Sequence, residues 1–262
     1  MSRRFQGAIF DVDGVLVDSP HEAAWQEALE ELMTSDWSDI AGETSWSKEA
    51  FTPQVYQQIM SGKPRQEGAL AALEYFGIPD AERRAEEYGE RKQKLIVTLI
   101  EQGRFEAYPD ALRFCLAVRA AGIKTAAASS SKNAKLFLEK IPLDEFAKKE
   151  GLDYDFIEPG LNLSNFFDAD ISGRDFDKGK PNPEIFLTAA SELGFDPEDC
   201  FVIEDAQSGI EAAKAGNMAG LGLARHDDDD LLAAADADIV VHSLDEIDLE
   251  ALQQGELARR GG

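Results

Sequence analysis

The sequence predicts an α/β fold: a doubly wound parallel sheet covered by helices, with a second, helical domain inserted near the N-terminus. Two observations predict it. Short apolar segments alternate with stretches of helical periodicity along most of the chain, which is the pattern of a helix-covered parallel sheet. This alternation stops between Asp18 and about Ala107, where strand signals are absent and helical patterns follow one another.

The elements of the sheet domain follow from apolar runs bounded by turn residues. Strands are expected at residues 6–10, 123–128, 201–203, 218–223 and 238–241, with a strand-like pattern at 166–171. Helices are expected at 111–121, 133–140, 183–193 and 207–215. Residues 141–165 are polar and contain two prolines and two glycines, so we interpret them as a long loop that serves as decoration or an oligomer contact, with a functional loop as the alternative.

The inserted domain is expected to be all helical. Helical periodicity occurs at residues 21–33, 66–76 and 81–100, and Pro20 and Pro109 stand at its two ends, where proline stops a helix. The predicted domains are therefore residues 1–18 together with 107–262 as the α/β core, and residues 19–106 as the helical domain.

The charge of the chain excludes several classes of partner. Its 262 residues include 51 acidic and 26 basic side chains, a formal net charge of −25, with an acidic run at Asp227–Asp230 that fits a solvated surface. Such a chain repels nucleic acid and anionic membranes, so neither is an expected partner.

The apolar segments and the cysteines point to an intracellular protein. No apolar window reaches the roughly 18 residues of a membrane span. The apolar stretch after the basic start ends at Asp11, too early for a secretory signal, and a cytoplasmic location is expected. Cys115 and Cys200 have no metal or redox spacing, so both are interpreted as reduced packing residues.

Two aspartates follow the first predicted strand. Asp11 and Asp13 are separated by one residue and precede Gly14, which can turn the chain so that the two carboxylates take different positions around one point. Asp-x-Asp-Gly also occurs in ordinary turns. A calcium loop of the EF-hand type is excluded because its fifth position, counted from Asp11, is Val15.

Three further polar segments are each followed by a helical pattern. They contain Ser129 to Asn133, Lys180 between Gly179 and Pro181, and Glu204-Asp205. The carboxyl ends of parallel strands meet at one edge of a sheet, so these segments and the Asp11 segment are expected to converge on one crevice.

Together the four segments resemble the four motifs of the haloacid dehalogenase superfamily, in its phosphatase and phosphomutase branch. The resemblance covers nearly the whole chain and implies a Rossmann-like core whose inserted helical domain is a mobile cap over the active site. It assigns Asp11 as the nucleophile that forms an aspartyl-phosphate, and Asp13 as the general acid and base. Ser129 and the backbone after it would bind phosphate oxygens, and Lys180 would pair with both the nucleophile and the phosphoryl group.

The resemblance also implies a magnesium ion, which neutralises the approach of two anions. Its expected ligands are the carboxylates of Asp11 and Asp205, the backbone carbonyl of Asp13, and Glu204 directly or through water. The alternative for Glu204-Asp205 is a capped turn ahead of the helix that begins near Ser208.

Within the superfamily, the inserted domain resembles the cap of β-phosphoglucomutases. Three residues of this domain resemble residues that serve a phosphosugar with a second phosphate: His21, Lys92, and Arg65 in the segment Gly62-Lys63-Pro64-Arg65. In the core, Ser131, Lys132 and Asn133 also resemble this subgroup. Together with Ser130, they are the expected substrate-binding residues of the core. Solvated helix-face charges are the alternative for Arg65 and Lys92. Two departures from close mutases are the short segment between Asp18 and His21 and the insert at 141–165.

The function that follows is magnesium-dependent phosphoryl transfer on a phosphorylated sugar, with β-phosphoglucomutase-like isomerisation as the specific prediction. A phosphatase for sugar phosphates or similar monoesters is the alternative, and a catalytically silent binding module is a third. The expected partner is a small phosphorylated metabolite, a hexose phosphate, and the expected assembly is a monomer or weak homo-oligomer.

Overall fold

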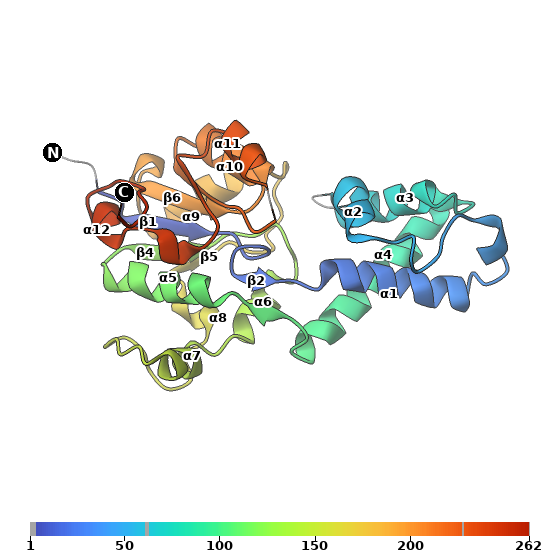
Figure 1. Ribbon diagram of the computed structural model, residues 1–262, viewed down its shortest axis with the longest axis horizontal. Coiled ribbons are helices and arrows are strands. Elements are labelled where there is room, and N and C mark those ends of the chain that lie inside the picture. The colour runs from blue at the N-terminus through green and yellow to red at the C-terminus, as the bar shows by residue number, and fades with distance from the viewer. Residues whose placement is uncertain (1–3, 61–62, 227, 262) are drawn as a thin grey trace. The chain divides into compact units, whose positions relative to one another are not determined.

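The computed structural model describes residues 4–60, 63–226 and 228–261 (Figure 1). Gly62 of the cap segment and Asp227 of the acidic run lie outside the described residues. The chain divides into two compact units, one made of Met1–Ser19 with Glu106–Gly262 and the other of Pro20–Phe105. No helix in the described part of the chain is long and apolar enough to cross a membrane.

The first unit is built on a six-stranded sheet in the order β5-β4-β1-β6-β7-β8, and every strand pair in it is parallel. The strands are β1 (Gly7–Phe10), β4 (Lys124–Ala127), β5 (Ala169–Asp170), β6 (Cys200–Glu204), β7 (Ala219–Leu223) and β8 (Ile239–Val241). The predicted fold class is confirmed. Because β1 lies between β4 and β6, the carboxyl ends of these three strands adjoin one another.

The sheet is buried on both faces, which explains why its strands are almost uniformly apolar. Ile9 and Val202 share a buried cluster with residues of α9 and α10, whereas Phe10 contacts Phe114 of α5 at a ring distance of 6.1 Å. Adjacent strand residues point to opposite faces, so α5 covers one face and α9 and α10 the other.

The helices of this unit are α5 (Pro109–Ala120), α6 (Ala134–Glu139), α7 (Leu143–Glu150), α8 (Leu163–Phe166), α9 (Glu184–Leu193), α10 (Gln207–Ala215), α11 (Asp229–Ala234) and α12 (Leu249–Gln253). Short 3-10 turns occur at η3 (Pro197–Asp199) and η4 (Leu244–Glu246). Both cysteines are buried and free, and burial raises the pKa of the Cys200 thiol to about 12.

The second unit is helical. It contains α1 (His21–Thr34), η1 (Ala41–Glu43), α2 (Pro53–Val55), the π-turn η2 (Tyr56–Met60), α3 (Arg65–Tyr75) and α4 (Ala81–Glu101). Its own core includes Trp25, Leu29, Leu73 and Tyr88. The Tyr88 hydroxyl donates to the carbonyl of Trp25 at 2.9 Å, which joins α4 to α1.

Several features differ from the sequence prediction. The ends of the helical insertion are joined by a short antiparallel ribbon, β2 (Val17–Asp18) with β3 (Glu106–Ala107). The sequence did not predict this ribbon because a strand of two residues is too short to show the alternation of apolar and polar side chains. The strand-like pattern at 166–171 shortens to β5, because Phe166 ends α8.

The interpretation of residues 141–165 as a long loop is wrong, because the segment contains α7 and α8. Leu143, Ala147 and Leu163 are buried, and α7 ends at Glu150, ahead of Gly151, which has a positive φ of 70°. The segment is tied to α5 through Arg113, which pairs with Glu150 at 2.7 Å, and through Arg119, which lies 5.8 Å from the Phe156 ring.

Candidate active site

The expected catalytic groups of the core follow neighbouring strands. Asp11 comes directly after β1, Ser129 follows β4, and Glu204 and Asp205 stand at the end of β6. The backbone N–H of Asp11 donates to the carbonyl of Ile203 at 3.1 Å, so the sheet ladder continues up to the first site residue. The ladder thus fixes Asp11 beside the Glu204-Asp205 pair.

Lys180 joins this group from the loop that precedes α9. Its ammonium donates to Oδ1 of Asp11 at 2.7 Å and also to Oε1 of Glu204. The Asp11 and Glu204 carboxylates keep the pKa of Lys180 above its ordinary value despite its burial, so the side chain stays a cation.

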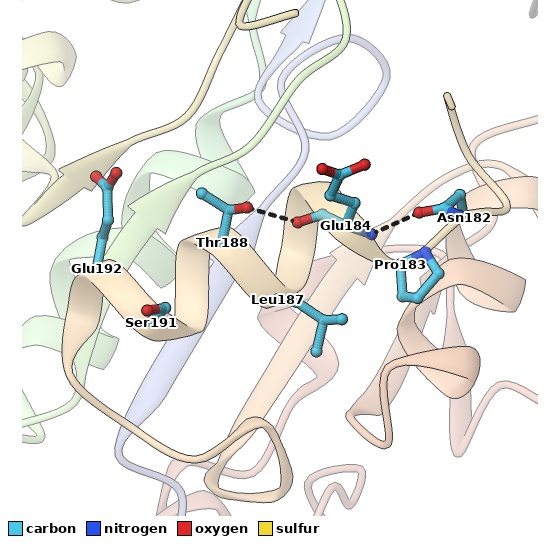
Figure 2. A pocket seen from close by; sticks show the side chains of 7 residues that line it. All are labelled: Asn182, Pro183, Glu184, Leu187, Thr188, Ser191 and Glu192. Atoms are coloured by element: carbon cyan, nitrogen blue, oxygen red, sulfur yellow. Dashed lines mark hydrogen bonds between the residues drawn. The ribbon is translucent and has the colours of Figure 1, made fainter. Parts of the chain in front are cut away.

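The loop that carries Lys180 leads into α9 and is held at that end by a side-chain hydrogen bond. The Lys180-Pro181 peptide is cis, and Oδ1 of Asn182 accepts from the backbone N–H of Glu184 at 3.0 Å at the start of α9 (Figure 2). The pocket drawn in Figure 2 runs along α9 and is lined by none of the expected site residues.

Asp11, Glu204 and Asp205 form a group that could hold a metal ion, because one carboxylate oxygen from each lies within 4.8 Å of the others. Burial raises the pKa of Asp11 to about 7, with Lys180 lowering it and Glu204 and Asp13 raising it. Burial and the neighbouring carboxylates likewise raise the pKa of Asp205 well above its usual range. Lys180 pairs with two of these three carboxylates, Asp11 and Glu204, and the all-oxygen donor set fits a hard divalent cation such as magnesium.

Glu204 has a second partner besides the lysine, since its Oε2 accepts from the backbone N–H of Ala206 at 3.1 Å. Sequence reasoning placed Glu204 near the metal and did not identify its ion pair with Lys180. With both of its oxygens engaged, Glu204 is suited to orienting the lysine and to contacting a metal through water.

Two glycines make room for these carboxylates. A Cβ on Gly14, which has a φ of +79°, would lie 1.9 Å from Oδ2 of Asp205, and a Cβ on Gly209 would lie 2.0 Å from Cδ of Glu204. Gly209 was not recognised from the sequence as part of the site. The available signal was a glycine in the first turn of a helix, directly after an acidic pair.

The segment after β4 forms a compact series of serine turns. Ser129 Oγ accepts from the N–H of Ser131 at 3.1 Å, and Ser131 Oγ accepts from the N–H of Asn133 at 3.3 Å. Ser129 and Asn133 are buried and Ser130 is exposed. The exposed Lys132 donates to Gly173 at 2.8 Å and to Asp175, so its ammonium is tied to the loop after β5.

In the helical unit the structure brings two of the three expected residues together. Lys92 is 6% exposed, and its Nζ lies 3.1 Å from Nδ1 of His21 and 5.0 Å from the Trp25 ring. The solvated-charge alternative is therefore wrong for Lys92. Arg65 is exposed at the start of α3, and its aliphatic stem passes over Gly89, where an added Cβ would lie 3.3 Å from Cγ of Arg65.

Comparison with known proteins identifies the family. Residues 5–217 match the family model of the haloacid dehalogenase-like hydrolases. The chain belongs to this family. The predictions of the superfamily and of an enzyme are confirmed.

Members of this family with named activities include mutases and a phosphatase. A β-phosphoglucomutase of Mycobacterium bovis is 30% identical over 231 residues, which cover 84% of this chain and 80% of that protein. A phosphorylated carbohydrates phosphatase of Thermotoga maritima is 29% identical over 214 residues, covering 81% and 82%. The crystal structure of a β-phosphoglucomutase from Pyrococcus sp. strain ST 04 is 31% identical, covers 95% of this chain and 99% of its own, and superposes with a TM-score of 0.68.

Proposed function

We propose that this chain is a magnesium-dependent phosphoryl-transfer enzyme that acts on a hexose phosphate through an aspartyl-phosphate on Asp11. The observation that carries the proposal is the contact of 2.7 Å between the Asp11 carboxylate and Lys180, beside Glu204 and Asp205. A carboxylate that meets a dianionic phosphoryl group needs cations at that point, and this arrangement supplies one and could hold a second.

In this proposal an Asp11 oxygen attacks phosphorus while Lys180 pairs with the phosphoryl oxygens and with the nucleophile. Asp13 gives its proton to the leaving oxygen as the P–O bond breaks, and later takes a proton from the hydroxyl that attacks the aspartyl-phosphate. Ser129 and the N–H groups after it bind phosphoryl oxygens. Magnesium, held by Asp11, Asp205 and the Asp13 carbonyl, would neutralise part of the phosphoryl charge.

The specific reaction we propose is β-phosphoglucomutase-type isomerisation, with the helical unit acting as the cap. A mutase must hold a bisphosphate by both ends, which requires a second cationic site. In this proposal Arg65 binds the distal phosphate, because a guanidinium can donate two parallel hydrogen bonds to phosphate oxygens. The contact of the buried Lys92 with His21 brings two of the residues expected to serve the second phosphate together, which supports a shared role for them.

Hydrolysis of sugar phosphates is the second candidate, favoured by the similarity to the Thermotoga maritima phosphatase. It needs one phosphate site, and water takes the place of the sugar hydroxyl. A catalytically silent binding module does not require a buried lysine that pairs with two buried carboxylates, so these ion pairs argue against that alternative. The cytoplasmic location and the monomeric or weakly oligomeric state remain predictions.

The test supplies β-glucose 1-phosphate with a trace of glucose 1,6-bisphosphate and follows glucose 6-phosphate and free phosphate separately. A mutase forms the isomer much faster than it releases phosphate. Phosphate release as fast as isomer formation, or no isomer from any hexose 1-phosphate, would leave the phosphatase. Excess chelator should stop either reaction, magnesium should restore it, and calcium should restore it poorly because calcium coordinates more loosely.

A further inference from the structure

A buried ion pair between Asp110 and Arg225 contacts the turn that follows Asp13. Asp110 lies in the first turn of α5, and Arg225 follows β7 after one intervening residue. Nη1 of Arg225 donates to Oδ2 of Asp110 and Nη2 donates to Oδ1, each at 3.1 Å, and the two side chains are 12% and 9% exposed. The pair joins residues 115 positions apart in the chain, and nothing in the sequence pattern singled it out.

Two further donors of Arg225 contact the backbone of that turn. Its Nε donates to the carbonyl of Gly14 at 3.4 Å, its Nη2 donates to the carbonyl of Val15 at 3.3 Å, and the guanidinium lies 3.8 Å from the Tyr108 ring centre. A planar guanidinium can make these contacts at once, whereas an ammonium cannot.

Asp110 is held by two further contacts besides the arginine. Its Oδ2 also accepts from the hydroxyl of Ser243 at 3.0 Å and from the N–H of Leu244 at 2.9 Å. Burial raises the pKa of Asp110, but hydrogen bonds and the charge of Arg225 outweigh it and hold the pKa below its usual range. The pair is therefore ionised, and it ties the start of α5 and the residue before η4 to the turn.

The position of this turn matters to two site carboxylates. Asp13 directly precedes Gly14, and Gly14 packs so closely on Asp205 that an added Cβ would lie 1.9 Å from Oδ2. A shift of the Gly14 and Val15 carbonyls would therefore move the Asp13 backbone and change the room available to Asp205.

We propose that Arg225, held by Asp110, is a positioning residue that fixes the turn after Asp13 so that the Asp13 carboxyl can protonate the leaving oxygen. This inference rests on the proposed function, in which Asp13 is the general acid. It assigns to Arg225 a specific effect on the proton transfer and none on substrate affinity.

The leaving group separates this role from simple structural support. An alkyl phosphate such as a sugar phosphate needs a proton on its leaving oxygen, whereas p-nitrophenolate leaves without one. Mispositioning of Asp13 should therefore slow turnover of the sugar phosphate and spare phosphoenzyme formation from p-nitrophenyl phosphate. A partly unfolded enzyme would lose both activities in equal proportion.

The experiment compares wild type with Arg225→Lys, which keeps the charge and loses the fork. We expect kcat for the sugar phosphate to fall about tenfold to a hundredfold with KM within about twofold, because small misplacements of a catalytic group cost rates of that order. The phosphoenzyme burst with p-nitrophenyl phosphate should change less than about threefold. The matched control is Arg113→Lys, since Arg113 also forks onto a carboxylate, Asp245, but does not touch the turn, and it should leave both activities near wild type.

A second variant guards against loss of folding through an unpaired buried charge. Arg225→Met combined with Asp110→Asn removes both charges and should fold, yet it should show the same selective loss on the sugar phosphate. Equal losses on both substrates, or a rise in KM alone, would overturn the positioning role. If wild type turns over neither ester, the proposed function fails instead, so the two failures are distinguishable.

Discussion

The ammonium of Lys180 donates to Oδ1 of Asp11 across 2.7 Å, and the two side chains are only 12% and 9% exposed. Glu204 shares the same ammonium. Removing the lysine would leave buried carboxylates facing one another, and a buried charge without its partner is strongly unfavourable. The lysine therefore stabilises the site, and in the proposed function it also attracts the anionic substrate.

Lys180→Met should lower turnover by at least about a hundredfold, because it removes a preorganised cation from the developing phosphoryl charge. The measurement is kcat on the best sugar phosphate, with the melting temperature recorded in parallel. Lys178→Met is the control, since Lys178 is exposed two residues away. A Lys180→Met enzyme within tenfold of wild type would contradict the role given to the lysine.

Asp11→Asn should abolish turnover and at the same time stabilise the metal-free protein above pH 7. Because burial raises the pKa of Asp11 to about 7 from 3.8, the folded state binds the proton more tightly than the unfolded state. The free energy of unfolding of wild type therefore falls as pH rises from about 4 to 7, and asparagine avoids that loss.

The check is thermal unfolding in chelator, with Asp11→Asn melting above wild type at pH 8 and close to it near pH 4. Asp177→Asn, which removes an exposed charge, is the control. Magnesium should narrow the difference at pH 8, since a cation relieves the same repulsion in wild type. A lower melting temperature for Asp11→Asn at pH 8 would contradict the argument.

Gly209→Ala should displace Glu204, because the new Cβ would lie 2.0 Å from the carboxylate carbon. Overpacking of this kind costs about 1–3 kcal/mol of stability. We also expect lower kcat and a higher magnesium requirement, measured by titration of activity with the metal. Gly42→Ala is the matched control, since its Cβ would meet nothing within 4 Å. Equal behaviour of the two variants would show that the close contact is unimportant.

Arg65→Ala should slow isomerisation about tenfold to a hundredfold, because a charge-assisted contact with an anion is worth about 1.5–3 kcal/mol. Hydrolysis of a small generic phosphate ester, which has no distal phosphate, should change far less. Arg83→Ala is the control, since Arg83 is an exposed arginine of the same unit paired with Asp80. Parallel loss of both reactions would argue against a distal phosphate site at Arg65.

The sequence predicted the parts of this structure that rest on local patterns. The apolar runs around Ile9 and Val202 mark strands buried on both faces, and polar residues directly after them could be assigned to one edge of the sheet. The insert was misjudged because its polar residues outnumber its apolar ones. Leu143, Phe146 and Ala147 have helical spacing, and that signal was available.

Other features depend on contacts that no local pattern contains. In the pair Glu204-Asp205 either carboxylate could have met the lysine, and only the direction of each side chain at the end of β6 decides that Glu204 does. The ion pair of Asp110 with Arg225 likewise depends on how the residue after β7 meets the start of α5. Which side chains pair in these two cases depends on the tertiary packing of the backbone, and a local sequence pattern does not specify that packing.

The short ribbon of β2 and β3 has an evolutionary consequence. Val17 lies opposite Ala107 and Asp18 opposite Glu106, so the chain leaves the sheet unit and returns to it at one pair of hydrogen-bonded strands. Recombination that replaces the whole stretch from Pro20 to Phe105 keeps both sides of this junction and every strand of the sheet. With the helical unit acting as the proposed cap, a lineage with this architecture can exchange one helical module for another, and acquire new substrates, without rebuilding the sheet unit that carries Asp11 and Lys180.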